Sequence, residues 1–337
     1  MNNPGARLLV VAPNWLGDGI MAMPALQEMR KRLHPEAALL LAARPGQAPM
    51  WRMHRALSDV IPLPADTPRL IASSRRVKSL DCTHAVLIPH SFRSALIPAL
   101  AGIPHRRGTT TQFGRKFLLH DPVSLADLDS RHQQWETARL LLPGNLPDQL
   151  PPPELEPAEA EIQQAESLLR TLPSPRLGCI PGAARGPSKQ WPGDRFLEVA
   201  RAWIDRTGGG VCWLGTRDDV DLCHKLNRDL GAHGCSLAGK TSLPLFTALL
   251  KSLDQVLAND SGGMHLAAAV GTPLVAVFGS TDPDKTGPLS NKAVVLQHAD
   301  VRNRSIARTS DGARRALEAV SAAEGVKAVL ANRDLGR

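Results

Sequence analysis

Three glycine-containing stretches hold the residues whose types and spacing are suited to chemistry. The first, Pro13–Gly19 (PNWLGDG), places Asp18 between two glycines, just after a short apolar run and where a helix is expected to begin. A carboxylate at the mouth of a cleft can take a proton from an attacking hydroxyl group. An aspartate here can equally be an ordinary helix N-cap, so this stretch alone leaves both interpretations open.

The second stretch, Pro181–Pro192, follows another apolar run and contains Gly182, Ala183, Ala184 and Lys189. Small side chains leave backbone amides accessible, and the lysine adds a positive charge, a combination that suits a diphosphate. The spacing GxxxxGK[ST] of a P-loop is missing, which excludes that class of phosphate site. A plain surface loop is the alternative interpretation.

The third stretch, Leu257–Ala269, has the pattern of a strand, a tight turn and a helix. Asp260 and Ser261 can cap the helix, while Gly262 and Gly263 expose amides at its positive end, where a phosphate binds favourably. His265 falls in the first turn, and we expect it to face the same anion rather than to be purely structural.

Acidic residues also follow a predicted strand in Gly215–Asp219. Asp219, or less clearly Asp218, is placed to accept hydrogen bonds from ribose hydroxyls. The alternative is that both are acidic residues favoured at a helix N-terminus. The His, Cys and Asp residues show no metal-ligand spacing, and a GxSxG elbow is absent.

The elements that must position these residues follow an alternating strand-helix pattern, which predicts an α/β fold with parallel sheets covered by helices. Strands are expected at Arg7–Pro13, Ala37–Ala43, His84–Pro89, Leu177–Ile180, Gly210–Leu214, Ser236–Leu237, Gln255–Ala258 and Pro273–Phe278. Helices are expected at Gly19–Leu33, Ala158–Leu172, Asp194–Arg206, Asp218–Leu230, Leu243–Ser252 and Gly262–Val270, with a helical tail over Ala307–Arg337.

A proline-dense segment, Leu141–Pro157, interrupts this pattern and is predicted to be a linker. It divides the chain into domains 1–157 and 158–337. Two such domains imply a cleft, with ligands beyond the carboxyl ends of the strands.

The formal net charge of +8 is distributed unevenly along the 337 residues. The chain through His120 has sixteen Lys and Arg against six Asp and Glu, whereas the remainder has 24 against 26. Candidate basic patches are Arg75–Lys78, His105–Arg107 and Arg115–Lys116. They are either a solvated surface or a contact with an anionic partner such as lipid phosphate.

Several classes of protein do not fit this composition. The chain has no Tyr, only six Phe and no recognisable nucleic-acid module, which argues against nucleic acid as a partner. It has no apolar run long enough to span a membrane and no signal-peptide pattern. Its five cysteines form no CxxC pair, as expected for reduced thiols in the cytosol.

Taken together, the motifs resemble the ADP-heptose:lipopolysaccharide heptosyltransferases of glycosyltransferase family 9, over about Leu8–Ser290, most of the chain. Within that family, the second inner-core type is the most similar. The matching stretches are Pro13–Leu26, Leu87–Gly108, Phe113–Leu119, Gly182–Pro192, Leu237–Leu243, Asn259–Pro273 and Phe278–Pro283.

The resemblance implies a GT-B architecture, with two Rossmann-like domains facing across a cleft. The acceptor would bind domain 1–157 and the nucleotide-sugar domain 158–337. It further implies an inverting transfer of heptose from ADP-heptose to the inner core of lipopolysaccharide, without cofactor or metal. The enzyme would be cytoplasmic and peripheral on the inner membrane.

The same resemblance assigns roles to individual residues. Asp18 would be the catalytic base, and Lys189 would stabilise the ADP leaving group together with amides at Ser261, Gly262 and Gly263. Asp219 would hold the ribose, and Asp260 and His265 would shape the pyrophosphate site. The remaining assignments are nucleotide-sugar contacts at Gly182, Ala183 and Ala184, and acceptor contacts at Trp15, Gly17, Arg93, Arg106 and Arg107.

The sequence departs from the family pattern in one segment. Members of the second type usually carry a cysteine-rich segment after the FGSTDP stretch, whereas Gly287–Arg308 contains no Cys.

Three alternatives remain. One is a family 9 relative with another nucleotide-sugar or acceptor, and a second is a non-catalytic nucleotide-binding module. The third, a nicotinamide dehydrogenase, has only the partial glycine fingerprint of Gly17, Gly19 and Ala22, with Arg44 where an acidic residue is expected.

Overall fold

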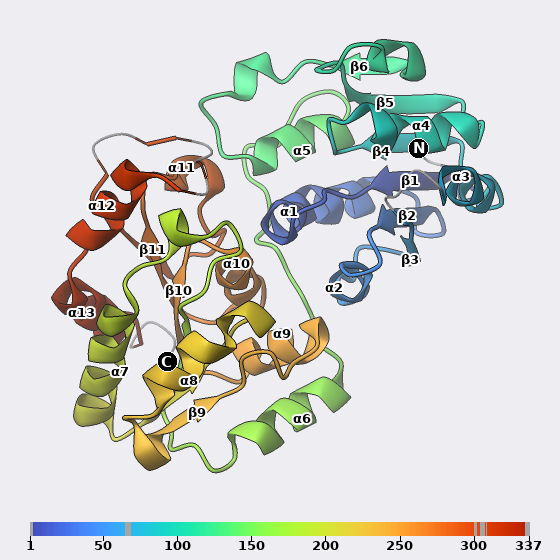
Figure 1. Ribbon diagram of the computed structural model, residues 1–337. Coiled ribbons are helices and arrows are strands. Elements are labelled where there is room, and N and C mark those ends of the chain that lie inside the picture. The colour runs from blue at the N-terminus through green and yellow to red at the C-terminus, as the bar shows by residue number, and fades with distance from the viewer. Residues whose placement is uncertain (1–2, 65–68, 300–301, 304–306, 308, 334–337) are drawn as a thin grey trace. The chain divides into compact units, whose positions relative to one another are not determined.

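A computed structural model describes residues 3–64, 69–299, 302–303, 307 and 309–333. The chain forms two compact units, Met1–Leu155 and Glu156–Arg337 (Figure 1). Each is an α/β unit built on a parallel six-stranded sheet. The predicted α/β class with two Rossmann-like halves is therefore confirmed.

The first unit has the strand order β3-β2-β1-β4-β5-β6. Its central strands are continuous apolar runs, as expected where helices cover both faces of a parallel sheet. The strands are β1 (Arg7–Val11), β2 (Ala38–Ala43), β3 (Asp59–Pro62), β4 (His84–Leu87), β5 (His105–Thr109) and β6 (Asp121–Val123).

Helices of the first unit pack in pairs, α1 against α5 and α3 against α4. Apolar residues of β1, β2 and β4 form one core with Val77 and Ala95 from α3 and α4. The helices are α1 (Leu16–Arg32), α2 (Ala48–Arg52), α3 (Leu70–Lys78), α4 (Phe92–Leu100) and α5 (Gln134–Leu141), with 3-10 turns η2 (Arg115–Leu118) and η3 (Ala126–Leu128).

The second unit has the order β12-β11-β10-β7-β8-β9. Counted within the unit and read from the other edge, this is again 3-2-1-4-5-6, the doubly wound order of the first sheet. The strands are β7 (Arg176–Ile180), β8 (Gly210–Trp213), β9 (Gly234–Ser236), β10 (Gln255–Asn259), β11 (Leu274–Phe278) and β12 (Ala293–Gln297).

Helices α6 and α9 pack together, as do α7 and α13, in the second unit. A core lies between the sheet and α7, α8, α12 and α13, and it includes Trp191, Trp203 and Trp213. The helices are α6 (Glu159–Leu169), α7 (Gly193–Thr207), α8 (Val220–Asn227), α9 (Leu243–Lys251), α10 (Gly262–Ala269), α11 (Pro283–Thr286), α12 (Asp311–Ala319) and α13 (Ala322–Arg333), with 3-10 turns η4 (Pro187–Lys189), η5 (Arg217–Asp219) and η6 (Gly231–His233).

Every strand expected from the sequence is present to within two residues, whereas β3, β5, β6 and β12 were not expected. Strand β5 has the sequence HRRGT, which reads as a charged loop rather than as a strand. The proline-dense segment between α5 and α6 contains no helix or strand, and its Glu154 carbonyl lies 3.0 Å from Nδ1 of the buried His54. The predicted helical tail forms α12 and α13 and packs in the second unit; its residues 308 and 334–337 lie outside the described residues.

Candidate active site

The glycine-containing stretches lie at the switch points of the two sheets. In the first unit, β1 is hydrogen-bonded to both β2 and β4, and Asp18 follows β1. In the second, β7 is hydrogen-bonded to both β8 and β10, and the stretches with Lys189 and Asp260 follow β7 and β10. Doubly wound sheets bind ligands in the crevice beyond the carboxyl ends of the strands at this point.

Asp18 is not a helix cap. The N-cap of α1 is Trp15, which makes no side-chain capping hydrogen bond, and Asp18 is the third residue of the helix. The prediction that the helix starts at Gly19 was therefore wrong by a turn, because Leu16 and Gly17 already belong to it. A carboxylate in the first turn is favoured by the helix dipole, and its oxygens remain available to other partners.

Gln133, which precedes α5, is one such partner. Its Nε2 atom donates a hydrogen bond of 3.2 Å to Oδ1 of Asp18. The two residues are 115 positions apart, and packing of α5 on α1 brings them together. Sequence reasoning missed Gln133 because nothing local marks it.

A cavity of about 310 Å³ lies beyond the carboxyl ends of β1, β2 and β4 in the first unit. Its polar lining includes Asn14, Arg44, Ser91, Arg93 and Ser94. Gln47 Nε2 fixes the Asn14 carbonyl through a hydrogen bond of 2.7 Å. Of the predicted acceptor residues, Arg93 lines this cavity. Trp15 follows the lining residue Asn14 in the sequence, and its side chain is 56% exposed.

Arg106 and Arg107 serve the fold of the first unit. Arg106 donates to the carbonyls of Leu118 and Ile103. Arg107 donates to the carbonyls of Leu140 and Arg139 and pairs with Asp121. Each guanidinium therefore joins β5 to other parts of the first unit, and the acceptor contact of these two residues stays a prediction.

Arg115 is fully buried, so its prediction as part of a basic surface patch was wrong. Its guanidinium donates to the carbonyls of Thr109 (2.7 Å) and Ser91 and to the Ser94 hydroxyl (2.8 Å). Burial lowers the pKa of Arg115 to about 10. The residue ties η2 to the loop before α4, which lines the cavity above. Lys116 beside it is exposed, as are Arg75, Arg76 and Lys78 on α3.

In the second unit, one buried amide side chain holds both ends of the loop that carries Lys189. Asn259 ends β10 and has no exposed surface. Its Oδ1 accepts from the Trp191 amide at 2.9 Å, and its Nδ2 donates to the Pro181 carbonyl at 2.7 Å. The sequence patterns assigned no role to Asn259, although it belongs to one of the matching stretches. A polar residue at the end of an apolar strand is the signal that could have identified it.

Lys189 lies at the end of η4 and forms an ion pair with Asp260, directly after β10. The side chains are only 11% and 6% exposed. The structure thus brings together two predicted residues from stretches 71 positions apart. A lysine ammonium has three donors, so one bond to Asp260 leaves donors for a phosphate oxygen.

The N-terminus of α10 points its first amides beyond the sheet edge. Ser261 is the N-cap and makes no side-chain capping hydrogen bond. Within the described residues, the buried hydroxyls of Ser261 and of Thr281, which follows β11, have no hydrogen-bond partner. His265 is 5% exposed on the same helix. Unsatisfied donors at a helix N-terminus fit an anionic ligand.

Gly182 and Gly263 are required by close packing. A Cβ atom at Gly182 would lie 2.0 Å from Oδ1 of Asp219, so a carboxylate fills that space. At Gly263 it would lie 2.8 Å from Cδ1 of Ile180, so this glycine lets α10 approach β7.

Asp219 takes part in a capping box with Thr216. Its Oδ2 accepts from both the amide and the hydroxyl of Thr216 at 2.8 Å. Asp219 is thus an acidic residue in the first turn of a helix, as the alternative interpretation expected. Its Oδ1 side faces the loop after β7, which keeps it next to the predicted diphosphate site.

Helix α12 and Val320, which follows it, contact the loop that carries Lys189, here called the lysine loop. Helix α12 packs on η4, and Trp191 Nε1 donates to the Val320 carbonyl at 2.9 Å. A Cβ atom at Gly279, after β11, would lie 3.0 Å from the Ala313 carbonyl and 3.4 Å from the Ser188 carbonyl. Helix α12 therefore packs directly against the lysine loop.

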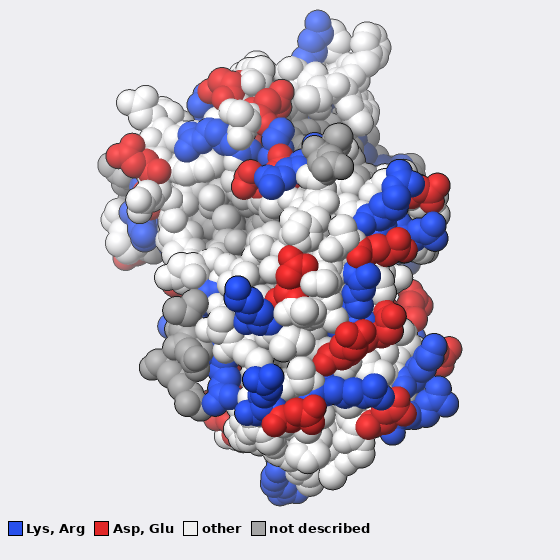
Figure 2. Space-filling model, turned by 90° about the vertical axis from the view of Figure 1, so that its left-hand side faces the viewer, with Lys and Arg blue, Asp and Glu red and all other residues white. Residues whose placement is uncertain are grey.

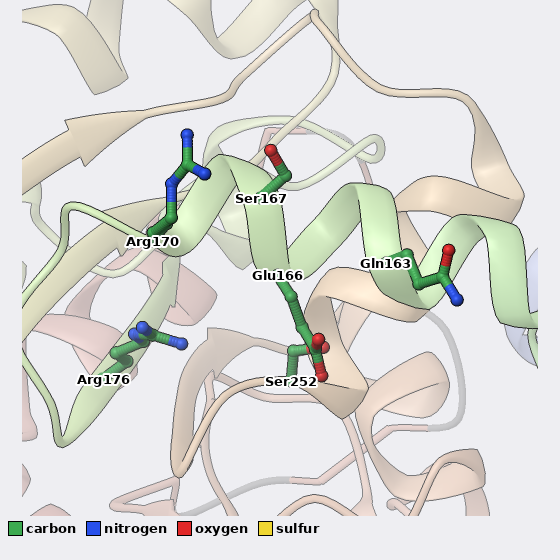
Figure 3. Close-up of a pocket in the computed structure, with 6 residues that line it drawn as sticks. All are labelled: Gln163, Glu166, Ser167, Arg170, Arg176 and Ser252. Atoms are coloured by element: carbon green, nitrogen blue, oxygen red, sulfur yellow. The ribbon is translucent and has the colours of Figure 1, made fainter.

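A larger cavity of about 560 Å³ lies elsewhere in the second unit. Figure 3 shows Arg170, which follows α6, and Arg176, the first residue of β7, on one side of it, and Glu166 reaching toward Ser252. Because Arg176 begins β7, this cavity is at the amino edge of the sheet. It is separate from the loops that follow β7 and β10.

Among the described residues, no three His, Cys, Asp or Glu side chains group closely enough to hold a metal ion. The same part of the chain contains no helix long and apolar enough to cross a membrane.

Comparisons with known proteins agree on one family. Residues 71–311 match the family model described as glycosyltransferase family 9 (heptosyltransferase). Lipopolysaccharide heptosyltransferase 2 of Escherichia coli K12 is 31% identical over 86% of this chain and 88% of its own length. Lipooligosaccharide heptosyltransferase 2 of Haemophilus ducreyi is 31% identical over 87% and 89%. The solved structure of E. coli ADP-heptose LPS heptosyltransferase II superposes with a TM-score of 0.85 at 27% identity, covering 98% of this chain and 99% of that one.

Proposed function

The chain belongs to glycosyltransferase family 9, the heptosyltransferases, and from this premise we propose that it transfers heptose from ADP-heptose to the inner core of lipopolysaccharide. The family model covers most of the chain, and full-length relatives carry lipopolysaccharide heptosyltransferase 2 as their name. The observation that carries the proposal is the Lys189–Asp260 ion pair, of which Asp260 is buried and Lys189 is 11% exposed, next to the N-terminus of α10.

The second domain, 158–337, binds the ADP moiety in this proposal. The amides at Ser261, Gly262 and Gly263 and the small residues Gly182–Ala184 surround the diphosphate. Asp219 accepts from the ribose on its Oδ1 side, and His265 lines the same site.

Asp260 has a modified role in this proposal. A carboxylate repels a diphosphate, so Asp260 acts by holding the Lys189 ammonium in place rather than by touching the phosphates. The lysine then stabilises the negative charge that develops on the ADP leaving group.

The first domain, 1–157, binds the acceptor. The Asp18 carboxylate takes the proton of the acceptor hydroxyl, whose oxygen attacks the anomeric carbon as the bond to the β-phosphate oxygen breaks. Attack from the face opposite ADP inverts the anomeric centre. The donor bond of Gln133 orients the carboxylate, and Arg93 in the cavity beyond β1, β2 and β4 contacts acceptor anionic groups, with Trp15 and Gly17 alongside.

Because the acceptor is a lipid, the proposal places the enzyme on the cytoplasmic surface of the inner membrane. The basic excess of the first third of the chain supports this place. On the face shown in Figure 2, blue and red side chains are interspersed over the lower part, so that area has no single-sign field.

The test is mass spectrometry of a truncated lipopolysaccharide acceptor after incubation with ADP-heptose. We expect a mass increase of one heptose from the wild-type chain. The Asp18→Asn variant should lose about 100-fold or more in kcat with little change in ADP affinity, as removal of a general base does. The Lys189→Met variant should lose about 100- to 1000-fold in kcat.

The alternatives give different outcomes. Transfer from another ADP- or GDP-sugar at a higher kcat/KM would favour a family 9 relative with another donor. Calorimetric binding of ADP with no transfer to any core acceptor would favour a non-catalytic module. Family membership removes the dehydrogenase alternative.

A further inference from the structure

Three of the six phenylalanines of this chain face solvent in one part of the first unit. Phe113 is 101% exposed, Phe117 is 76% exposed and Phe92 is 40% exposed. Large apolar side chains grouped in this way on a surface mark an interaction site. We call Phe92, Phe113, Lys116 and Phe117 the aromatic patch.

Contacts between two segments of the chain, the start of α4 and the turn at η2, bring these residues together. Phe92 begins α4, and its amide donates to Gln112 Oε1 at 2.6 Å. A Cβ atom at Gly114 would lie 3.5 Å from the Phe92 ring. Lys116 Nζ lies 5.1 Å from the centroid of the Phe117 ring.

The segment that carries Phe113 and Phe117 is anchored to the rest of the first unit by hydrogen bonds. Between Phe113 and Phe117, the buried guanidinium of Arg115 donates to three oxygens, one each from β5, the loop before α4 and α4 itself. Gly114 has a φ of 77°, a left-handed conformation that turns the chain so that Arg115 points inward. The rings of Phe113 and Phe117 are therefore exposed because the turn at Gly114 directs Arg115 inward, in a segment that is itself anchored by hydrogen bonds.

The cations beside the aromatic patch indicate which kind of surface it binds. Lys116 lies within it, and Arg93 is exposed next to Phe92. The chain through His120 carries ten more basic than acidic residues. Aromatic rings with cations beside them suit an anionic bilayer surface, where rings enter the headgroup layer and the cations contact phosphates.

We propose that the aromatic patch docks the first unit on an anionic lipid bilayer, with Phe113 and Phe117 inserted at the interface and Lys116 at the phosphates. This deepens the proposed function, on which the choice of a lipid surface rests. It assigns docking to residues distinct from Asp18 and from the cavity that contains Arg93.

The experiment is co-sedimentation of the full-length chain with vesicles of phosphatidylcholine alone or with one quarter phosphatidylglycerol. Wild type should bind the anionic vesicles more tightly, and the Phe113→Ser/Phe117→Ser double variant should bind them at least about tenfold more weakly, because two rings leave the interface. Lys116→Gln should weaken binding several-fold and only on anionic vesicles. Leu168→Ser, at an exposed apolar residue of α6, is the matched control and should bind like wild type.

Transfer to a deacylated, water-soluble acceptor separates this proposal from the proposed function. The double variant should retain wild-type kcat on that acceptor and lose rate on an acceptor embedded in vesicles. Failure of wild type to transfer heptose would refute the proposed function but leave the vesicle result meaningful. Equal vesicle binding by wild type and the double variant would overturn the docking proposal. It would also be overturned if light scattering showed that wild type forms a dimer, that the double variant is a monomer, and that both bind vesicles equally.

Discussion

The hydrogen bonds of Asn259 allow a quantitative prediction about the lysine loop. Asn259→Ala removes one acceptor and one donor, which leaves the Trp191 amide and the Pro181 carbonyl buried without their partner. Each such loss costs about 1–3 kcal/mol, so the second unit should lose about 2–6 kcal/mol of unfolding free energy unless the loop shifts.

A shift of the loop would relieve part of this cost but would move Lys189. Displacing a catalytic group by about 1 Å costs about 100-fold in rate. We therefore expect the kcat of Asn259→Ala to fall about 100-fold and the affinity for ADP to fall as well. Heptose transfer kinetics, calorimetry with ADP and a urea midpoint from tryptophan fluorescence measure the three quantities.

Asn332→Ala is the matched control. Asn332 is 1% exposed in the same unit, and its Nδ2 donates to the carbonyls of Leu274 and Lys292 at 3.2 and 3.1 Å. It should lose similar stability but keep kcat and ADP affinity, because it holds α13 and not the lysine loop. If Asn259→Ala keeps a kcat within about threefold of the control variant, the positioning role assigned to Asn259 is wrong.

Three further predictions address other contacts. Gly182→Ala should weaken ADP binding at least about tenfold, because a Cβ atom there collides with Asp219; calorimetry measures it, and unchanged affinity would remove Asp219 from the site. Gln133→Leu should lower kcat about tenfold with an unchanged KM for ADP-heptose, because the Asp18 carboxylate loses a donor; a changed KM alone would contradict this. Burial lowers the pKa of His54 below 6.5, so the unfolded chain binds the proton first and stability should fall as pH drops below about 6.5; His54→Gln should flatten that part of a urea-midpoint series, and an unchanged slope would refute the assignment.

Sequence patterns were sufficient for the central strands and for the loops at the switch points. Strands such as β1 and β10 are short apolar runs followed by glycine-containing turns, and both signals are local. Strand β5 was missed because its arginines read as surface charge. Their guanidinium groups instead donate to backbone carbonyls that are 3 to 33 residues away in the sequence. The more distant of these partners cannot be recognised from a local pattern.

The sequence by itself determined which residues carry charge and where the chain turns, since strand periodicity, glycine and capping chemistry act over a few positions. Only the tertiary structure decided the partners. It showed that Asp18 lies inside α1 rather than at its cap, that Gln133 reaches it across 115 residues, and that Asn259 joins both ends of the lysine loop. Such contacts depend on how helices and strands pack, and packing is fixed by many long-range contacts at once rather than by any short stretch of sequence.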